Sequence, residues 1–165
     1  MSSYTVTNNL TLRSYYSTYR TLAVKSNRSN ATTNQLNYAD AQALRRAVRK
    51  LDDFDFSNAT QKDIEEHVRA LIDTYNNTLD SAQQSDNANI KSIYKKLQQL
   101  NDTYQDDLEN IGIRTNSSGY LTLSSSASSN ISSSKFSKFL GGDSSFMNKL
   151  STYAKRIAGH VDYYA

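Results

Sequence analysis

Hydrophobic residues recur at spacings of three and four in several parts of this chain, which is the period of an amphipathic α-helix. The first such stretch runs from about Gln35 to Phe54, with apolar positions at Ala39, Ala43, Leu44, Ala47, Val48, Leu51 and Phe54. The second has its apolar positions at Ile64, Val68, Leu71, Ile72, Tyr75 and Leu79, and it follows a near capping box at Thr60 and Asp63. The two patterns predict two helices, each with one apolar face to bury.

A third stretch has spacings close to those of a heptad seam. Its apolar positions are Ile90, Ile93, Leu97, Leu100, Tyr104, Leu108 and Ile111. Residues 81–89 before it are polar, and we expect a turn near Ser85 to Asn87 that folds the second and third helices into an antiparallel hairpin. Because neither Gly nor Pro occurs there, the alternative is one continuous helix of about 50 residues, roughly 75 Å long.

The third pattern ends in residues typical of a helix stop followed by a turn. Gly112 can adopt the left-handed conformation that closes a helix, and Asn116 to Gly119 supply turn residues. Tyr120 to Leu123 then alternate as in a short β-strand. Residues 117–137 include 11 serines among 21 residues, which predicts a low-complexity linker that is mobile in part.

The last apolar pattern predicts a C-terminal helix. It is preceded by an apolar patch at Phe136, Phe139 and Leu140 and then by two glycines. Asp143 is placed to act as the N-cap of this helix. The apolar side of the helix consists of Phe146, Leu150, Tyr153, Ile157 and Val161.

The predicted fold class is mainly all-α: a helical bundle or coiled-coil hairpin of four principal helices, with a small β-turn element and a C-terminal helix. A chain of 165 residues is long enough to bury a substantial core in one domain. We divide it into an N-terminal arm at residues 1–34 and a single helical domain at residues 35–165, which contains the Ser-rich linker 117–137.

The N-terminal arm is basic and rich in tyrosine. Residues 1–35 contain no acidic residue, and their cations are Arg13, Arg20, Lys25 and Arg28. A nucleic-acid-binding module is the alternative function, because tyrosines near these cations could stack on single-stranded bases. These tyrosines are Tyr4, Tyr15, Tyr16 and Tyr19. We favour a polar, partly disordered terminus whose aromatic residues dock on the body of the protein. A second basic group on the first helix is interpreted as solvated surface: Arg45, Arg46, Arg49 and Lys50.

The residue types present do not point to catalysis. The chain has no Cys, and its two histidines, His67 and His160, stand far apart without a metal-binding spacing. The serines lie in tracts without a nucleophile-elbow motif, and no phosphate-binding loop or dinucleotide fingerprint occurs. We therefore predict no enzyme activity, no cofactor and no metal site.

The order of several motifs resembles the C-terminal helical region of the bacterial flagellar filament cap family, hook-associated protein 2. The motifs are the segment Val68 to Asn76, the helix end Ile111-Gly112-Ile113, the turn with Gly119, Leu121-Thr122-Leu123, and a final helix from Phe146 to Ile157. The chain lacks the β-rich insertion through which cap proteins contact flagellin, and Ser124 stands where the family usually has Asp. The resemblance implies a helical module that acts without catalysis.

The predicted function is a structural or protein-interaction module that works by helix-mediated contact. The candidate contact residues lie on the seam of the third helix: Ile93, Leu97, Leu100, Tyr104 and Leu108. Partners would be other proteins, through self-association or as flagellar components if the resemblance holds, whereas nucleic acid is the less favoured partner. The apolar pattern shows no secretory signal and no membrane span, so the resemblance implies flagellar-type export to the exterior, and otherwise the expected location is cytoplasmic.

A small secreted helical-hairpin protein is a further interpretation of the same pattern. Its typical Trp-x-Gly turn is missing, because the chain contains no Trp.

Overall fold

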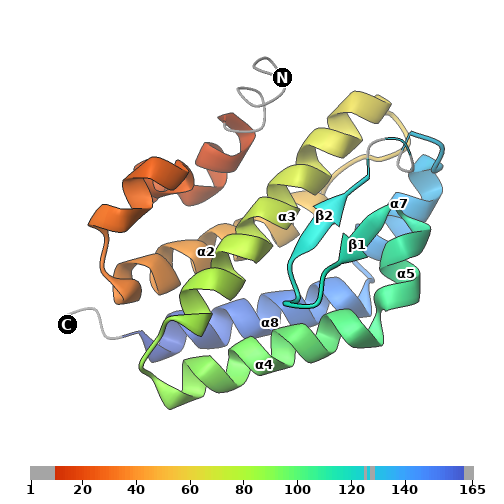
Figure 1. The fold of residues 1–165 in the computed structure, drawn as a ribbon. Helices are drawn as coiled ribbons and strands as arrows, with labels where there is room; N and C mark the ends of the chain where they lie inside the picture. The colour runs from red at the N-terminus through yellow and green to blue at the C-terminus, as the bar shows by residue number, and fades with distance from the viewer. Residues whose placement is uncertain (1–9, 125, 127–128, 162–165) are drawn as a thin grey trace.

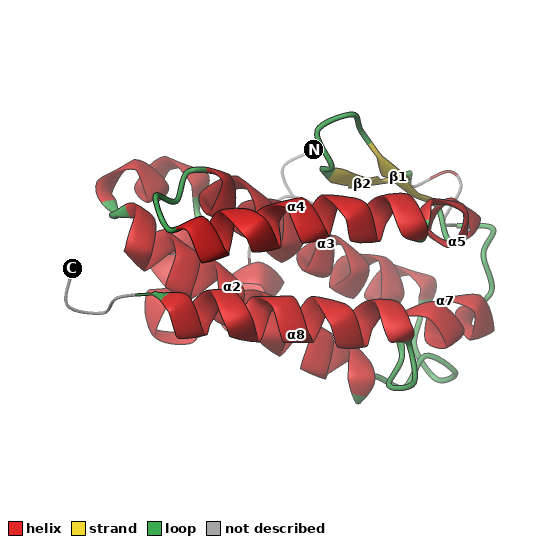
Figure 2. Cartoon of the chain, turned by 90° about the horizontal axis from the view of Figure 1, so that it is seen from below, coloured by secondary structure: helices red, strands yellow, loops and turns green. Residues whose placement is uncertain are grey.

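Four long helices form the body of this computed structural model, which describes residues 10–124, 126 and 129–161 (Figure 1). They are α2 at Thr33–Asp52, α3 at Gln61–Gln83, α4 at Ala88–Thr103 and α8 at Ser145–His160. Helix α2 packs against α3 and α8, and α4 packs against the same two helices, so the four close around one core. Figure 2 shows α4 and α8 side by side, with α2 and α3 behind them. The mainly all-α prediction is confirmed.

Side-chain caps explain where these helices begin. Thr32 and Gln35 form a complete capping box at the start of α2, and the Thr60 hydroxyl accepts a hydrogen bond from the Asp63 N–H at the start of α3. The carboxamide oxygen of Asn87 accepts from the first N–H groups of α4. A polar turn at residues 84–87 therefore separates α3 from α4. The hairpin prediction is confirmed, and the alternative of one continuous helix is wrong.

The third predicted helix is divided at Tyr104. Helix α4 ends at Thr103, and the short helix α5 covers Gln105–Asn110. Gly112 then adopts φ 80°, the left-handed conformation expected from the sequence. Strand β1, Ile113–Thr115, pairs antiparallel with β2, Leu121–Leu123, and Ile113 lies opposite Leu123. The predicted β-turn element is thus a small hairpin, which we call the β-hairpin.

Two asparagines attach the β-hairpin to the bundle. The carboxamide of Asn76 on α3 donates to the Leu121 carbonyl and accepts from the Leu121 N–H, both at 2.9 Å. Asn101 on α4 donates to the Gly119 carbonyl at 2.8 Å. Gly119 has φ +91°, and a Cβ there would lie 3.0 Å from Cγ of Gln98. The turn therefore requires glycine both for its conformation and for its close approach to α4.

Replacing Asn76 with alanine should lower the free energy of unfolding by about 1–3 kcal/mol, because both main-chain groups of Leu121 lose their partner. Urea unfolding followed by circular dichroism would measure the change. The matched control is Asn148→Ala on the exposed side of α8, which should change stability by less than about 0.5 kcal/mol. Equal stabilities of the two variants would contradict this role of Asn76.

Two boundaries near the C-terminus differ from the prediction. Helix α7, Ser133–Leu140, begins inside the segment predicted as a linker, because Phe136 and Leu140 are four positions apart and both become buried. Residues 125 and 127–128 of that linker lie outside the described residues. The N-cap of α8 is Ser144 rather than Asp143, and its hydroxyl accepts from the Met147 N–H at 3.2 Å.

Residues 10–31 form a set of helical turns that we call the N-terminal segment. Residues 10–16 are helical, and two 3-10 helices follow, η1 at Ser17–Ala23 and η2 at Lys25–Asn30. Leu12, Tyr15 and Tyr16 are buried, so the expected docking of aromatic residues on the body is confirmed for these two tyrosines. Residues 10–34 comprise these helical turns and the start of α2, whereas residues 1–9, including Tyr4, lie outside the described residues, so the partly disordered arm stays a prediction.

A buried polar network holds the N-terminal segment on α2 and α3. Asp40 on α2 is completely buried and accepts two hydrogen bonds from the Arg28 guanidinium, at 2.8 and 2.7 Å, and one from the Tyr16 hydroxyl at 2.6 Å. Asn77 on α3 donates to the Tyr16 hydroxyl at 3.0 Å. Burial and then the Asp40 carboxylate raise the pKa of Tyr16 well above its usual value. Burial opposes the charge on Arg28, but Asp40 outweighs it and raises the pKa of Arg28.

Candidate functional site

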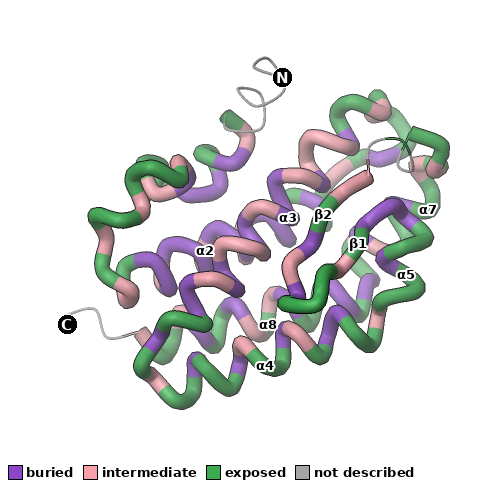
Figure 3. Tube along the Cα trace, viewed as in Figure 1, coloured by how far each residue is buried: buried purple, intermediate pink, exposed green. Residues whose placement is uncertain are grey.

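The seam predicted to contact partners lies mostly inside the bundle. Ile93, Leu97, Leu100 and Leu108 are each at most 4% exposed, and the buried positions of α4 turn toward α3 and α8 in Figure 3. These four side chains form part of the core and have no surface to offer a partner. Tyr104 is the exception, because it lies at the junction of α4 and α5 and is only half-buried.

Tyr104 belongs to a cluster of three aromatic rings. Phe139 on α7 and Phe146 on α8 are stacked, with ring centroids 5.0 Å apart. Tyr104 meets both rings edge-on, at 6.0 Å from Phe139 and 5.5 Å from Phe146. The Lys149 ammonium lies 6.0 Å from the centre of the Tyr104 ring, at the outer limit of a cation–π contact. Phe146 is buried, so the ring surfaces that remain partly exposed are those of Tyr104 and Phe139.

A cavity of about 490 Å³ opens beside these rings, where α5, α7 and α8 meet. We call it the aromatic cavity. Charged side chains of both signs surround it: Asp107 on α5, Lys135 and Lys138 on α7, and Asp143 before α8. The remaining lining residues are Asn110, Ile111, Ser144 and Ser145. This volume lies within the range of pockets that hold a small ligand or an inserted side chain.

Sequence reasoning identified only part of this site. The sequence places Tyr104 on the seam and Phe139 in an apolar patch, but it does not indicate that the two rings meet. The two residues are brought together because the chain between them returns through the β-hairpin and α7. The available signal was the spacing of Phe136, Phe139 and Leu140, which is compatible with a short amphipathic helix.

The tyrosines proposed to stack on nucleic-acid bases are only partly accessible. Tyr15 is 5% exposed and Tyr16 is fully buried, whereas Tyr19 is 37% exposed and lies beside Tyr38 with ring centroids 6.0 Å apart. Burial raises the pKa of Tyr15, and the negative charge of Glu66 adds to this effect. The nucleic-acid alternative therefore loses two of its proposed stacking residues.

The basic residues on α2 differ in their surroundings: two are exposed to solvent, and one makes a structural contact. Arg49 and Lys50 are exposed, as expected for a solvated surface. Arg46 instead donates a hydrogen bond at 2.8 Å to the Tyr15 carbonyl, so it helps to hold the N-terminal segment on α2.

The described residues contain no group of three or more His, Asp or Glu side chains arranged to hold a metal ion. Within the same residues, no helix combines the length and the apolar character needed to cross a membrane. Comparison of the chain with protein-family models, with curated proteins and with solved structures found no match.

Proposed function

We propose that this protein is a non-catalytic protein-interaction module and that it contacts its partner through the aromatic cavity. The observation that carries the proposal is the placement of Tyr104 and Phe139. Both rings are partly exposed beside a cavity of about 490 Å³, although most large apolar side chains of the described residues are buried. Aromatic rings that line a pocket and are surrounded by polar residues are typical of the central contacts in protein interfaces.

The chemistry of the aromatic cavity indicates what it would bind. Stacking and edge-on contacts with Tyr104 and Phe139 favour an aromatic or branched aliphatic side chain of the partner. Lys135 and Lys138 on one element, with Asp107 and Asp143 on others, provide charges of both signs at the rim. Such a rim orients a partner and affects the rate of association more than the affinity.

The resemblance to the helical region of flagellar cap proteins is part of this proposal. Three of the motifs behind the resemblance share one structural task here, since Asn76, Gly119 and Leu121 take part in the contacts that attach the β-hairpin to α3 and α4. On this proposal the partner is a second copy of the chain or a flagellar component. The contact would use the aromatic cavity rather than the buried seam of α4.

The capacity of the aromatic cavity to accept a side chain is testable with N-acetyl-phenylalanine amide as the probe. Two-dimensional ¹H–¹⁵N NMR should show saturable shifts at residues 104–111 and 135–146. Tyr104→Ala should weaken binding of the probe by about fivefold to tenfold, which corresponds to roughly 1–1.4 kcal/mol. The matched control is Tyr153→Ala, which removes a half-buried tyrosine of α8 that does not line the cavity.

Absolute mass by light scattering, across protein concentrations and at low and high salt, tests whether the partner is a second copy. A defined oligomer that Tyr104→Ala dissociates and Tyr153→Ala preserves would support self-association through this cavity. A monomer at all concentrations would assign the cavity to a different protein. Absence of both saturable probe binding and association would refute the proposed function.

A further inference from the structure

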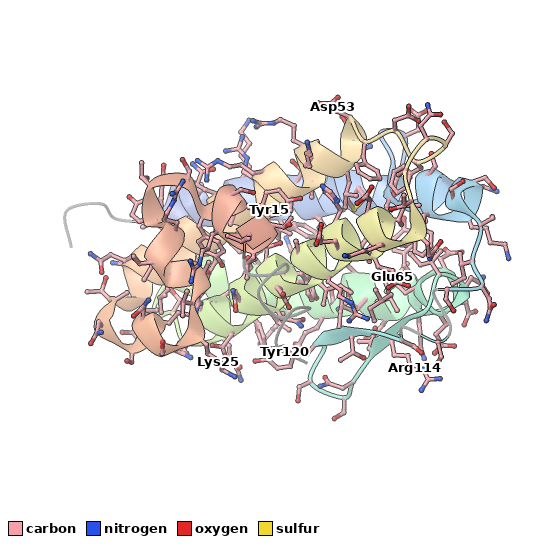
Figure 4. The ribbon with its side chains drawn as sticks, turned by 90° about the horizontal axis from the view of Figure 1, so that it is seen from above. Tyr15, Lys25, Asp53, Glu65, Arg114 and Tyr120 are labelled. Atoms are coloured by element: carbon pink, nitrogen blue, oxygen red, sulfur yellow. The ribbon has the colours of Figure 1, made fainter. Side chains whose placement is uncertain are left out.

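A second and larger cavity lies on the other side of the bundle. It has a volume of about 910 Å³, is open to solvent, and is lined by residues of the N-terminal segment, α3 and the β-hairpin. We call it the polar cavity. Figure 4 labels Lys25 of the N-terminal segment and Tyr120 of the β-hairpin. Both residues line the cavity, together with residues of α3. It shares no lining residue with the aromatic cavity.

Helix α3 contributes four polar side chains to this cavity: Asp73, Asn76, Asn77 and Asp80. Their spacing of three, four and seven positions places them on one face of the helix. Three of the four are committed to partners in the protein. Asn76 pairs with the main chain of Leu121, Asn77 donates to Tyr16, and Asp80 accepts from the Tyr120 hydroxyl at 3.1 Å.

Asp73 differs from these three neighbours. Within the described residues, its carboxylate has neither a hydrogen bond nor an ion pair shorter than 4.0 Å. Burial raises the pKa of Asp73 to about 6, and the charge of Arg69 offsets part of this effect. Asp73 is half-buried, and burial of a carboxylate that has no hydrogen-bond partner is unfavourable to the extent that neither a proton nor a cation compensates its charge.

Arg69 compensates part of the Asp73 charge, and the other cations near Asp73 make no ion pair with it in the described structure. The Arg28 guanidinium is held by Asp40, with both of its terminal nitrogens donating to that carboxylate. Lys25 is exposed and lines the cavity, but the described residues show no ion pair between its ammonium and Asp73 or Asp80. The Asp73 carboxylate in the cavity is therefore available to a ligand. The Asp80 carboxylate accepts hydrogen bonds from neutral donors only.

We propose that the polar cavity binds a linear organic cation, with one ammonium group at Asp73 and a second toward Asp80. Seven residues of helix separate the two carboxylates along α3, which is about 10 Å at about 1.5 Å per residue. A chain with ammonium groups several methylenes apart fits this separation, and its methylenes would pass Leu12, Ala23 and Val24 of the cavity wall. Free polyamines and lysine side chains of a polypeptide both provide this chemistry.

Spermidine and the peptide acetyl-Lys-Gly-Lys-amide serve as probes that separate these two sources. Each is titrated into the full chain at pH 7.5 and low salt and followed by ¹H–¹⁵N NMR, with an equal ionic strength of tetramethylammonium chloride as the reference. We expect saturable shifts at residues 23–28 and 73–80, including the side-chain amide of Asn77. Tighter binding of spermidine indicates a free polyamine, and tighter binding of the peptide indicates a polypeptide side chain.

The decisive variant is Asp73→Asn, which keeps the shape of the side chain and removes its charge. It should weaken the binding of the better probe by about tenfold or more. The matched control is Asp86→Asn in the exposed turn between α3 and α4, which should leave binding unchanged. If Asp73→Asn does not fold, Asp80→Asn replaces it and should also weaken binding of a probe with two charges.

The pH dependence of binding provides an independent readout. The charged and titratable groups around Asp73 are Lys25 and Arg28 of the N-terminal segment, Arg69 and Asp80 of α3, and Tyr120 of the β-hairpin. Since Asp73 takes up a proton near pH 6, its affinity for a cation should fall by about tenfold between pH 7.5 and pH 5. The Asp73→Asn variant should lack most of this dependence.

Three results would overturn the proposal. The first is the absence of saturable shifts with both probes in the unmodified chain. The second is equal binding by Asp73→Asn and Asp86→Asn. The third is binding that occurs only in Lys25→Gln, because the Lys25 ammonium would then itself be the cation that compensates Asp73. None of these results bears on the aromatic cavity, so this proposal and the proposed function fail independently.

Discussion

Replacing Asp40 with alanine should lower the free energy of unfolding by about 3–5 kcal/mol, the largest loss expected from any charged residue of this chain. The substitution removes the acceptor of Arg28 and Tyr16 at once, at a position that has no contact with solvent. The Arg28 guanidinium would remain between the N-terminal segment and α2 without a counter-ion, or the segment would detach. Either outcome is costly, because a charge loses its partner or a buried apolar surface reaches water.

Urea unfolding monitored by circular dichroism, together with amide hydrogen exchange of residues 10–31, would measure this effect. Asp40→Asn should lose less stability than Asp40→Ala, since the amide can still accept one hydrogen bond from Arg28 or Tyr16. Asp53→Ala is the control, because Asp53 is exposed just after α2, and its loss should change stability by less than about 0.5 kcal/mol. If Asp40→Ala were as stable as Asp53→Ala, the network would have no role in holding the segment.

Replacing Leu97 with alanine should lower the free energy of unfolding by about 2–5 kcal/mol and leave the mass in solution unchanged. Leu97 is completely buried on α4, so truncation creates a cavity in the core rather than removing a surface contact. Tyr104→Ala should show the reverse, with a smaller loss of stability and a larger loss of binding at the aromatic cavity. A loss of stability without a loss of binding indicates that a residue of the apolar pattern lies in the core. A loss of binding with little loss of stability indicates that it lies on the contact surface.

Unfolding in urea and light scattering on the same samples would measure both effects of Leu97→Ala. Lys96→Ala, at the neighbouring exposed position, is the control and should affect neither quantity. A dissociated oligomer with unchanged stability in Leu97→Ala would instead restore the prediction of a contact seam on the surface of α4.

The helical patterns were reliable wherever a long segment carried one apolar face. Helices α2, α3 and α4 follow the predicted stripes closely, because an apolar face of about four to six turns has no other stable way to leave water. Local hydrogen bonds at Thr60 and Gln35 decided the helix starts, and these depend on residues three positions apart. The turns at Gly112 and Gly119 were equally predictable, since a positive φ is a local requirement of the backbone that glycine meets.

The short elements were less predictable because distant residues stabilise them. Residues 10–16 are helical over two turns, and their Tyr15 and Tyr16 are buried only because α2 and α3 provide a surface. Helix α7 is likewise short, and its Phe136 and Leu140 depend on the end of the bundle for burial. Isolated helices of this length are marginal in water, so their sequences alone carry little information about their structure.

The sequence by itself determined the class of the fold, the four long helices and the glycine positions of the β-hairpin, because each depends on local periodicity or local backbone conformation. It favoured a turn between α3 and α4 but left one continuous helix open, since neither Gly nor Pro occurs there. Only the tertiary structure decided which apolar faces became core and which residues met in cavities. The heptad-like seam of α4 was compatible with an external contact until α3 and α8 covered it. Asp40 with Arg28, and Tyr104 with Phe139, are neighbours only after folding, since burial and electrostatic compensation depend on distances in space rather than along the chain.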